Sequence, residues 1–153
     1  MVTRSFTKDQ QVALEELIAK RRIEKVPVDA IRAQAFLEAA TDRITQCALL
    51  TSPVVQYAVA YDACHDVGEA LLAHYGYRTV NRAGQHEALG RFLRVVFTDP
   101  PGDQAAQRFD RLRRARNQAH YEAVPVGQAE ASMALSTAED LLLAAQQRIA
   151  AAQ

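Results

Sequence analysis

Cysteines and long apolar runs are both scarce in this sequence. Only Cys47 and Cys64 occur, and they do not form a CxxC pair, so we expect two reduced, partly buried side chains. No apolar run approaches the ~20 residues that a transmembrane helix needs. The N-terminus shows neither the apolar segment nor the cleavage site of a signal peptide. These absences predict a soluble cytoplasmic protein that does not bind membranes.

An excess of either charge sign is also missing. Lysine plus arginine and aspartate plus glutamate each number 18, which gives a formal net charge of zero. A basic surface over the whole molecule is therefore not expected, although this balance leaves room for a local basic patch. The chain has 153 residues, 49% of them hydrophobic, which suits a single domain over residues 1–153. Within it, we expect an N-terminal helix and linker at 1–28 and the bundle core at 29–153.

No segment is convincing as a β-strand, whereas helix-forming residues dominate the sequence. Three helix starts are marked by caps: Thr7 with Gln10 as a capping box, Asp29, and Ser52 followed by Pro53. Further helices are expected at about 85–97, at about 104–121, and in a last segment that contains Leu135, Leu142 and Ile149. The pattern predicts an all-α bundle of about five to six helices.

Two of these helices have identifiable apolar positions. In the helix that follows Asp29, the expected apolar positions are Ile31, Phe36, Ile44 and Leu49. In the helix at about 85–97, the residues expected to point inward are Leu89, Phe92, Leu93 and Val96.

The densest charge lies in the helix at about 104–121, where four arginines fall between Arg111 and Arg116. An α-helix turns about 100° per residue, so each side-chain direction can be compared with that of the apolar Phe109. Arg111 and Arg114 point to the opposite face and are expected to be solvated. Arg116 lies roughly 20° and Arg113 roughly 40° from Phe109. Two of the four arginines are therefore directed toward the core side.

His120 lies roughly 20° from Phe109 on the other side, one turn beyond Arg116. A charged side chain directed toward a core is costly unless it is paired or lines a cleft. One interpretation is that Arg116 forms an ion pair with another helix and that His120 is a hydrogen-bonded core histidine. The other is a polar site between helices, where bundles usually build their sites.

Such a site has a natural use in phosphate chemistry. Arginine presents a planar set of donors suited to phosphate, and histidine is the side chain best suited to proton transfer near neutral pH. On one face, Arg116 and His120 could hold a phosphodiester and move a proton together. Asn117, on the flank, could add a hydrogen bond to the substrate or to Arg116.

The segment "RNQAHY" on a late helix of an all-α bundle resembles the HEPN superfamily (higher eukaryotes and prokaryotes nucleotide-binding). The segment "YDACHDVGEALLAHYGYRTVNRAGQHEAL", residues 61–89, is similar to the HEPN pattern of an alanine-rich helix, a connector and a further helix start. The resemblance covers about Val54 to the end of the last helix. It departs from the family in the spacing between arginine and histidine. Only three residues separate Arg116 from His120, which is shorter than usual in the family, whereas five residues separate Arg114 from His120 and six separate Arg113 from it.

The resemblance implies a composite Arg/His site at a homodimer interface, which cleaves RNA without a metal or other cofactor through attack by the RNA's own 2′-hydroxyl. In that case His120 transfers the proton, Arg116 holds the phosphate and Asn117 supports them. The chain would then be a ribonuclease toxin or a defence component, paired with an antitoxin. The alternative is a catalytically inactive module that binds a nucleotide or a partner protein such as a nucleotidyltransferase.

Other polar residues are further candidates for contact with the substrate. Asp62 and His65, on the helix that begins at Pro53, are candidates to face Arg116 across the bundle and contact the substrate with Arg113. Tyr121 could stack on a base. The group of Asp62, His65, Asp66 and Glu69 supplies only part of a metal-ligand set, so no metal is expected.

A last candidate is the segment "GQHEAL" at 84–89, which places His86 and Glu87 in the first turn of a helix. A carboxylate near a helix start needs no function. His86 could contact an anion there. The HExxH zinc pattern is absent, because Gly90 stands where its second histidine is required.

Overall fold

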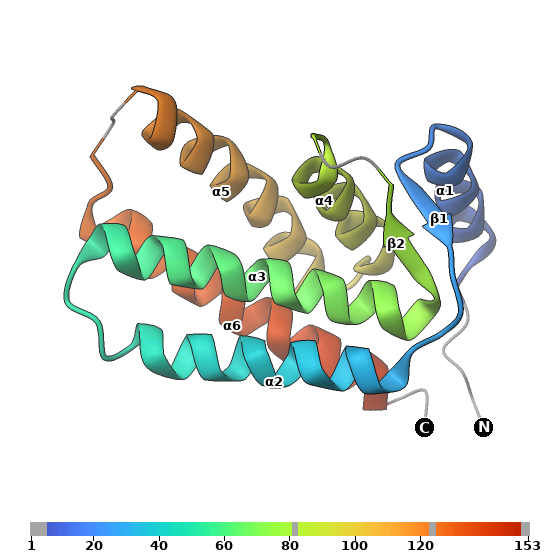
Figure 1. Ribbon diagram of the computed structural model, residues 1–153, viewed down its shortest axis with the longest axis horizontal. Helices are drawn as coiled ribbons and strands as arrows, with labels where there is room; N and C mark the ends of the chain where they lie inside the picture. The colour runs from blue at the N-terminus through green and yellow to red at the C-terminus, as the bar shows by residue number, and fades with distance from the viewer. Residues whose placement is uncertain (1–5, 81–82, 123–124, 151–153) are drawn as a thin grey trace.

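In the described part of the chain, six helices and one two-stranded antiparallel sheet make up the fold (Figure 1). The computed structural model describes residues 6–80, 83–122 and 125–150, and for residues 119–122 it describes the backbone alone. The helices are α1 (Lys8–Ala19), α2 (Ala30–Cys47), α3 (Pro53–Tyr75), α4 (Gln85–Val96), α5 (Gly102–Glu122) and α6 (Gln128–Ala150). The strands are β1 (Ile23–Lys25) and β2 (Tyr77–Thr79). The prediction of an all-α bundle with about five to six helices is confirmed.

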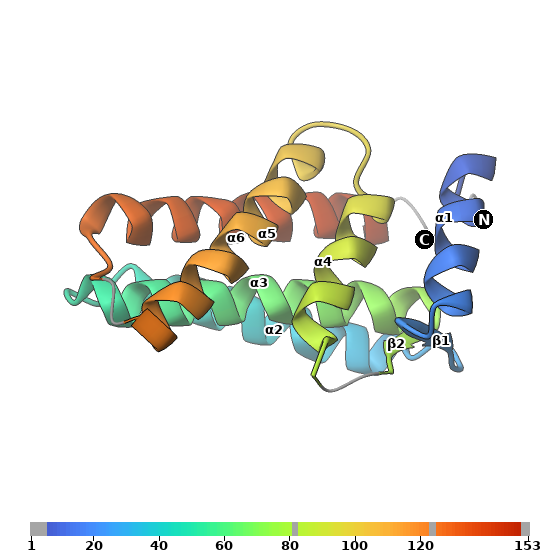
Figure 2. The ribbon, with the colours of Figure 1, turned by 90° about the horizontal axis from the view of Figure 1, so that it is seen from above.

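Helix α3 occupies the centre of the molecule. It packs most extensively on α2 and α6, which run alongside it, while α5, α4 and α1 lie in a row across its other side (Figure 1, Figure 2). The two-stranded sheet lies at the end of this row, beside α1 and α4. Within the described residues, every helix is too short or too polar to span a lipid bilayer.

The predicted helix starts are confirmed. The Thr7 side chain accepts a hydrogen bond from the Gln10 amide at 3.2 Å, and the Gln10 side chain accepts one from the Thr7 amide at 2.8 Å, which completes the capping box. Asp29 caps α2, and Ser52 caps α3 with Pro53 at its first position. Each cap contributes about 1 kcal/mol by satisfying amides that the helix leaves without a partner.

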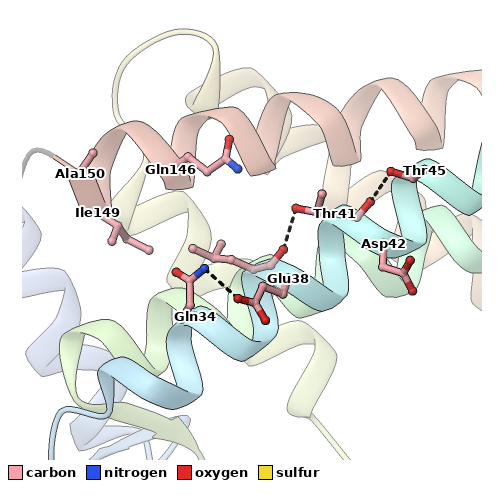
Figure 3. A pocket seen from close by; sticks show the side chains of 9 residues that line it. Gln34, Glu38, Thr41, Asp42, Thr45, Gln146, Ile149 and Ala150 are labelled. Carbon is pink, nitrogen blue, oxygen red and sulfur yellow. Dashed lines mark hydrogen bonds between the residues drawn. The ribbon is translucent and has the colours of Figure 1, made fainter.

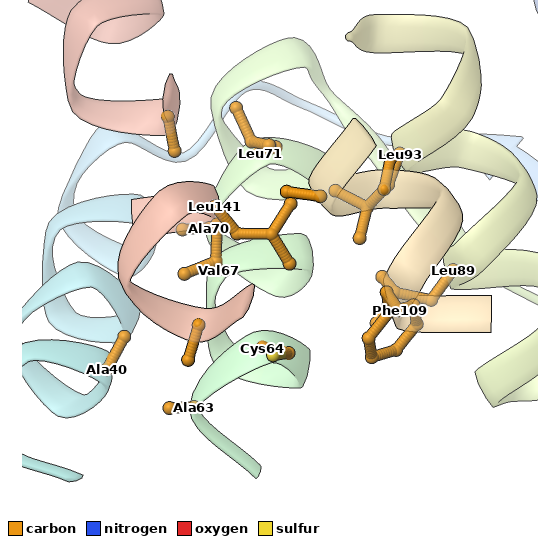
Figure 4. Close-up of a cluster of buried hydrophobic side chains, with 14 of the residues drawn as sticks. Ala40, Ala63, Cys64, Val67, Ala70, Leu71, Leu89, Leu93, Phe109 and Leu141 are labelled. Atoms are coloured by element: carbon orange, nitrogen blue, oxygen red, sulfur yellow. The ribbon is translucent and has the colours of Figure 1, made fainter. Parts of the chain in front are cut away.

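The core is built around α3, which is buried along most of its length because other helices cover both sides. Val67 and Leu71 of α3 are fully buried and belong to one cluster with Leu89 of α4, Phe109 of α5 and Leu141 of α6 (Figure 4). Complete burial of such a side chain contributes roughly 1.5–3 kcal/mol. The inward positions predicted for α4 are confirmed, since all of them are fully buried: Leu89, Phe92, Leu93 and Val96.

Two of the apolar positions named for the α2 segment are exposed. Ile31 is 86% exposed and Leu49, which lies beyond the helix end, is 74% exposed. The buried positions of α2 are smaller on average and spaced by three, four or seven residues: Ala33, Leu37, Ala40 and Cys47. Ile31 precedes Ala33 by two residues, or about 200° of rotation, and therefore points away from the core. Small side chains on the inner face allow α2 to approach α3 closely.

The two strands were not expected from the sequence. Ile23 pairs with Thr79 and Lys25 with Tyr77, and Glu24 forms an ion pair with a cross-strand arginine. Three residues are too few to show an alternating pattern, and the partners lie on opposite sides of two helices in the sequence. The sheet ties the turn after α1 to the end of α3, next to α4.

Candidate functional site

The core side of α5, predicted from the position of Phe109, is buried in the first half of the helix. Ala105 and Phe109 are fully buried, and Leu112 is nearly so. From this point the helix rises away from α3 toward its C-terminal end (Figure 1), and Arg116 and Asn117 are exposed. The arginine stretch therefore begins where α5 leaves the bundle.

Arg116 lies at the rim of the core and not inside it. Its guanidinium carbon lies 4.8 Å from the centroid of the Tyr61 ring, over one face of that ring. Among the described side chains, none forms an ion pair with Arg116. A guanidinium held over an aromatic ring keeps its N–H groups available at its edge. Arg116 therefore points toward α3, as helix geometry predicts, but it stacks on Tyr61 at the rim and does not enter the core.

Tyr61 connects Arg116 to two histidines. Its ring is fully buried and stacks against Phe109 at 5.4 Å between centroids. Its hydroxyl is hydrogen-bonded to Nδ1 of His86 at 2.8 Å, and the His86 ring lies 4.7 Å from the ring of His65. Tyr61, His65, His86 and Arg116 therefore form one polar cluster between α3, α4 and α5, which we call the Tyr-His-Arg cluster.

Both histidines of the cluster are neutral at pH 7. Burial lowers the pKa of His65 to about 4, and His86 and Arg116 contribute to the same shift. Burial also lowers the pKa of His86, again with help from Arg116. Neutral imidazoles can accept a proton or a hydrogen bond from a substrate. His65 has a buried Nε2 with no hydrogen-bond partner in the described part of the chain.

Arg113 lies next to the cluster but is already paired. Its guanidinium contacts Asp110 at 3.1 Å, and Arg114 contacts the other carboxylate oxygen at 2.9 Å. Burial opposes ionisation of Asp110, but Arg113, Arg114 and Arg94 together hold its pKa below the usual value. Arg113 also has a buried Nε without a hydrogen bond among the described residues. It therefore keeps one unused donor among the described residues.

The two candidate residues on α3, Asp62 and His65, have different environments in the structure. His65 joins the cluster, whereas the closest ion pair of Asp62 is with Arg43 of α2 at 3.8 Å. Arg43 also binds Asp66 at 2.8 Å, so these two carboxylates connect α2 to α3. Asp62 acts on the site at longer range, where its charge favours the protonated form of His86. Within the described residues, no group of three or more His, Cys, Asp or Glu side chains could hold a metal ion.

The side chains of His120 and Tyr121 lie outside the described residues, and only their place on the backbone of α5 is defined. His120 follows Arg116 by one turn and Tyr121 comes next along the helix.

Tyr61 and His86 were not among the predicted site residues. Tyr61 was not singled out, and its spacing of four from His65 is a local signal that both share a face. His86 had been noted for anion contact alone. Its hydrogen bond to Tyr61 joins residues 25 positions apart, which a local pattern does not reveal.

No family model, curated protein or solved structure matches this chain.

Proposed function

We propose that the Tyr-His-Arg cluster binds a phosphodiester of RNA and that the protein is a metal-independent endoribonuclease. The observation that supports this most is the position of Arg116. Its guanidinium has no ion pair among the described residues, lies over the Tyr61 ring, and adjoins two neutral histidines. A free arginine beside proton-accepting imidazoles is a combination suited to phosphoryl transfer.

The chemistry needs one base, one acid and one phosphate-binding group. A neutral imidazole removes the proton of the 2′-hydroxyl, and this oxygen attacks the adjacent phosphorus. The bond from phosphorus to the 5′-oxygen breaks, a protonated group donates a proton to that oxygen, and the products are a cyclic 2′,3′-phosphate and a 5′-hydroxyl. Arg116 stabilises the negative charge on the phosphoryl oxygens. No metal takes part in these steps.

The HEPN resemblance assigns the proton transfer to His120 and a supporting role to Asn117. It also implies a homodimer in which two copies of α5 meet. The exposure of Arg116 and Asn117 supports this, because side chains on the outward part of α5 remain accessible to a second copy. Under this proposal, Arg116 and His120 act together one turn apart.

A second candidate function is a catalytically inactive module that binds a nucleotide or a partner protein. The lowered pKa values of His65 and His86 favour it, because a general acid has to be protonated at working pH. A bound phosphate would raise these pKa values toward neutrality, since a nearby anion favours the charged imidazole. Cleavage and binding therefore have to be measured separately.

The test is cleavage of a labelled single-stranded RNA in the presence of EDTA by wild type and by Arg116→Ala and His120→Ala. We expect each substitution to lower the cleavage rate by at least ~10²-fold, as for loss of a charge-stabilising or acid–base group. Arg111→Ala is the matched control, because Arg111 is an exposed arginine of the same helix on a different face. It should retain the wild-type rate.

Three results would contradict the ribonuclease proposal. The first is a wild-type rate that EDTA abolishes. The second is equal activity of Arg116→Ala and Arg111→Ala. The third is a wild type that binds RNA without cutting it, which would support the inactive module. Circular dichroism melting curves of all variants show whether a loss of activity follows from a loss of fold.

A further inference from the structure

A groove of about 390 Å³ lies between α1 and α4, away from the Tyr-His-Arg cluster. Four cationic side chains line it, with Glu16 as the only carboxylate among the described lining residues. The cations are Lys20, Arg22, Arg91 and Arg94. We call this surface the basic groove. Its charge is opposite to that of a nucleic-acid backbone.

The local fold explains why these cations gather. Arg91 and Arg94 are three residues apart and share one face of α4. Lys20 ends α1, and the Arg22 carbonyl accepts a hydrogen bond from the Val80 amide at 3.1 Å, so the sheet holds this turn beside α4. The groove is therefore held by α1, α4 and the strand pair together.

Cations of the basic groove and of α5 act on a shared carboxylate. Glu87 of α4 is hydrogen-bonded to Arg91, and its pKa is lowered by Arg91 and, at longer range, by Arg22 and Arg113. Glu87 directly follows His86 in the sequence. The Glu87 carboxylate thus interacts electrostatically with cations of the groove and with Arg113 of α5.

Asp110 of α5 is a second carboxylate on which cations of both α4 and α5 act. Arg94, together with Arg113 and Arg114, lowers the pKa of Asp110. Gly90 of α4 faces Asp110, whose Oδ1 lies 3.9 Å from the position that a Cβ of residue 90 would occupy. Cations of α4 and α5 thus act on the same carboxylate, and α1, α4 and α5 lie side by side in Figure 1.

Two grooves differ in the charge of their lining, although the net charge of the chain is zero. The groove between α2 and α6, of about 460 Å³, is lined by Glu38 and Asp42 and by no lysine or arginine among the described residues (Figure 3). Glu38 there accepts a hydrogen bond from Gln34 at 3.3 Å. An anionic ligand is therefore attracted to the basic groove and not to the groove between α2 and α6.

We infer that the basic groove binds the backbone phosphates of single-stranded RNA on one side of the phosphodiester held by the Tyr-His-Arg cluster. This inference rests on the proposed function and specifies its substrate as an RNA of several nucleotides, not a dinucleotide. Lys20, Arg22, Arg91 and Arg94 contact phosphates and not bases, so the groove adds affinity without sequence preference.

Binding is measured by fluorescence anisotropy with a dinucleotide and with an RNA of about ten nucleotides, within the ~4–16-nucleotide range of single-strand binding sites. The variant Lys20→Gln/Arg94→Gln removes two exposed groove charges. The matched control Lys25→Gln/Arg111→Gln removes two exposed charges outside the groove. We expect the groove variant to bind the longer RNA about tenfold more weakly or worse. Its slope of log affinity against log salt should fall by about 1.4, or ~0.7 for each lost phosphate contact. The control should stay within about twofold of wild type.

The outcomes separate the two proposals. If wild type binds the dinucleotide and the longer RNA equally well, the groove does not bind phosphates and the inference is wrong, while the proposed function stands. Equal losses in the groove variant and the control would also overturn the inference, because they would show an effect of net charge alone. If wild type binds neither RNA, both the proposed function and the inference are wrong.

Discussion

Gly68 lies in the middle of α3 where Leu89 of α4 packs against it. A Cβ at position 68 would lie 2.7 Å from both Cγ and Cδ1 of Leu89 and 2.8 Å from Cδ2. Alanine in place of glycine gains about 1 kcal/mol in a helix interior, whereas overpacking a core costs about 1–3 kcal/mol. Rotation about the terminal torsion of Leu89 does not move its Cγ, so the steric cost lies near the upper end. We expect Gly68→Ala to lower the free energy of unfolding by about 1–2 kcal/mol.

Urea denaturation of four proteins measures this balance: wild type, Gly68→Ala, Leu89→Ala and the double variant. Leu89→Ala alone should cost about 2–5 kcal/mol, because it leaves a cavity. In the double variant the new methyl group occupies part of that cavity, so the double variant should be more stable than Leu89→Ala. The resulting interaction energy should be about 1–3 kcal/mol.

Gly90→Ala is the matched control for helix propensity. A Cβ at position 90 would lie 3.5 Å from the nearest Phe109 atom, which is an ordinary van der Waals contact. This substitution should stabilise the protein by up to about 1 kcal/mol. Gly68→Ala should not be as stable as wild type. Equal stability, or a double variant with no interaction energy, would show that α3 does not pack closely on Leu89 of α4.

Two further predictions concern buried titratable groups. The pKa of His65 is lowered from 6.5 to about 4, so between these pH values the unfolded chain binds a proton that the folded chain does not. The contribution of neutral His65 to the free energy of unfolding is therefore fully present above about pH 6.5. It falls by up to about 2–3 kcal/mol as the pH drops toward 4. Urea unfolding at pH 7 and pH 4.5 should show a smaller difference for His65→Gln than for wild type, and an equal difference would contradict the assignment. Burial raises the pKa of the Cys47 and Cys64 thiols, so neither should react with a thiol reagent at about pH 8 until urea unfolds the chain; rapid labelling of the native protein would contradict their burial.

Helix starts and the apolar stripe of α5 were predictable because their signals are local. A cap such as Thr7 with Gln10 acts within one helical turn, and the rotation of 100° per residue places Phe109 and Arg116 on one side whatever surrounds the helix. The face of α2 was harder to predict. Alanine contributes little to a hydrophobic pattern, so Ile31 and Leu49 were named as apolar positions and the buried Ala33 and Ala40 were not.

The candidate site could be predicted only in part. The exposure of Arg111 and Arg114 was predicted correctly, whereas Arg116, expected on the core side, is exposed and stacks on Tyr61 at the rim of the core. The environment of Arg116 did not follow from the sequence, because Tyr61 belongs to α3 and His86 to α4. The basic groove was not predicted either, since a net charge of zero does not show how charges are distributed over the surface.

By itself, the sequence determined the all-α class, the helix starts and the side of α5 on which Arg116 lies. Those features depend on capping, propensity and helical rotation, which act over a few residues. The tertiary structure alone decided that Tyr61, His65 and His86 meet Arg116, that Ile23 pairs with Thr79, and that cations of α1 and α4 share one groove. Each of these contacts joins segments that are distant in the sequence, and packing of the helices around α3 brings those segments together.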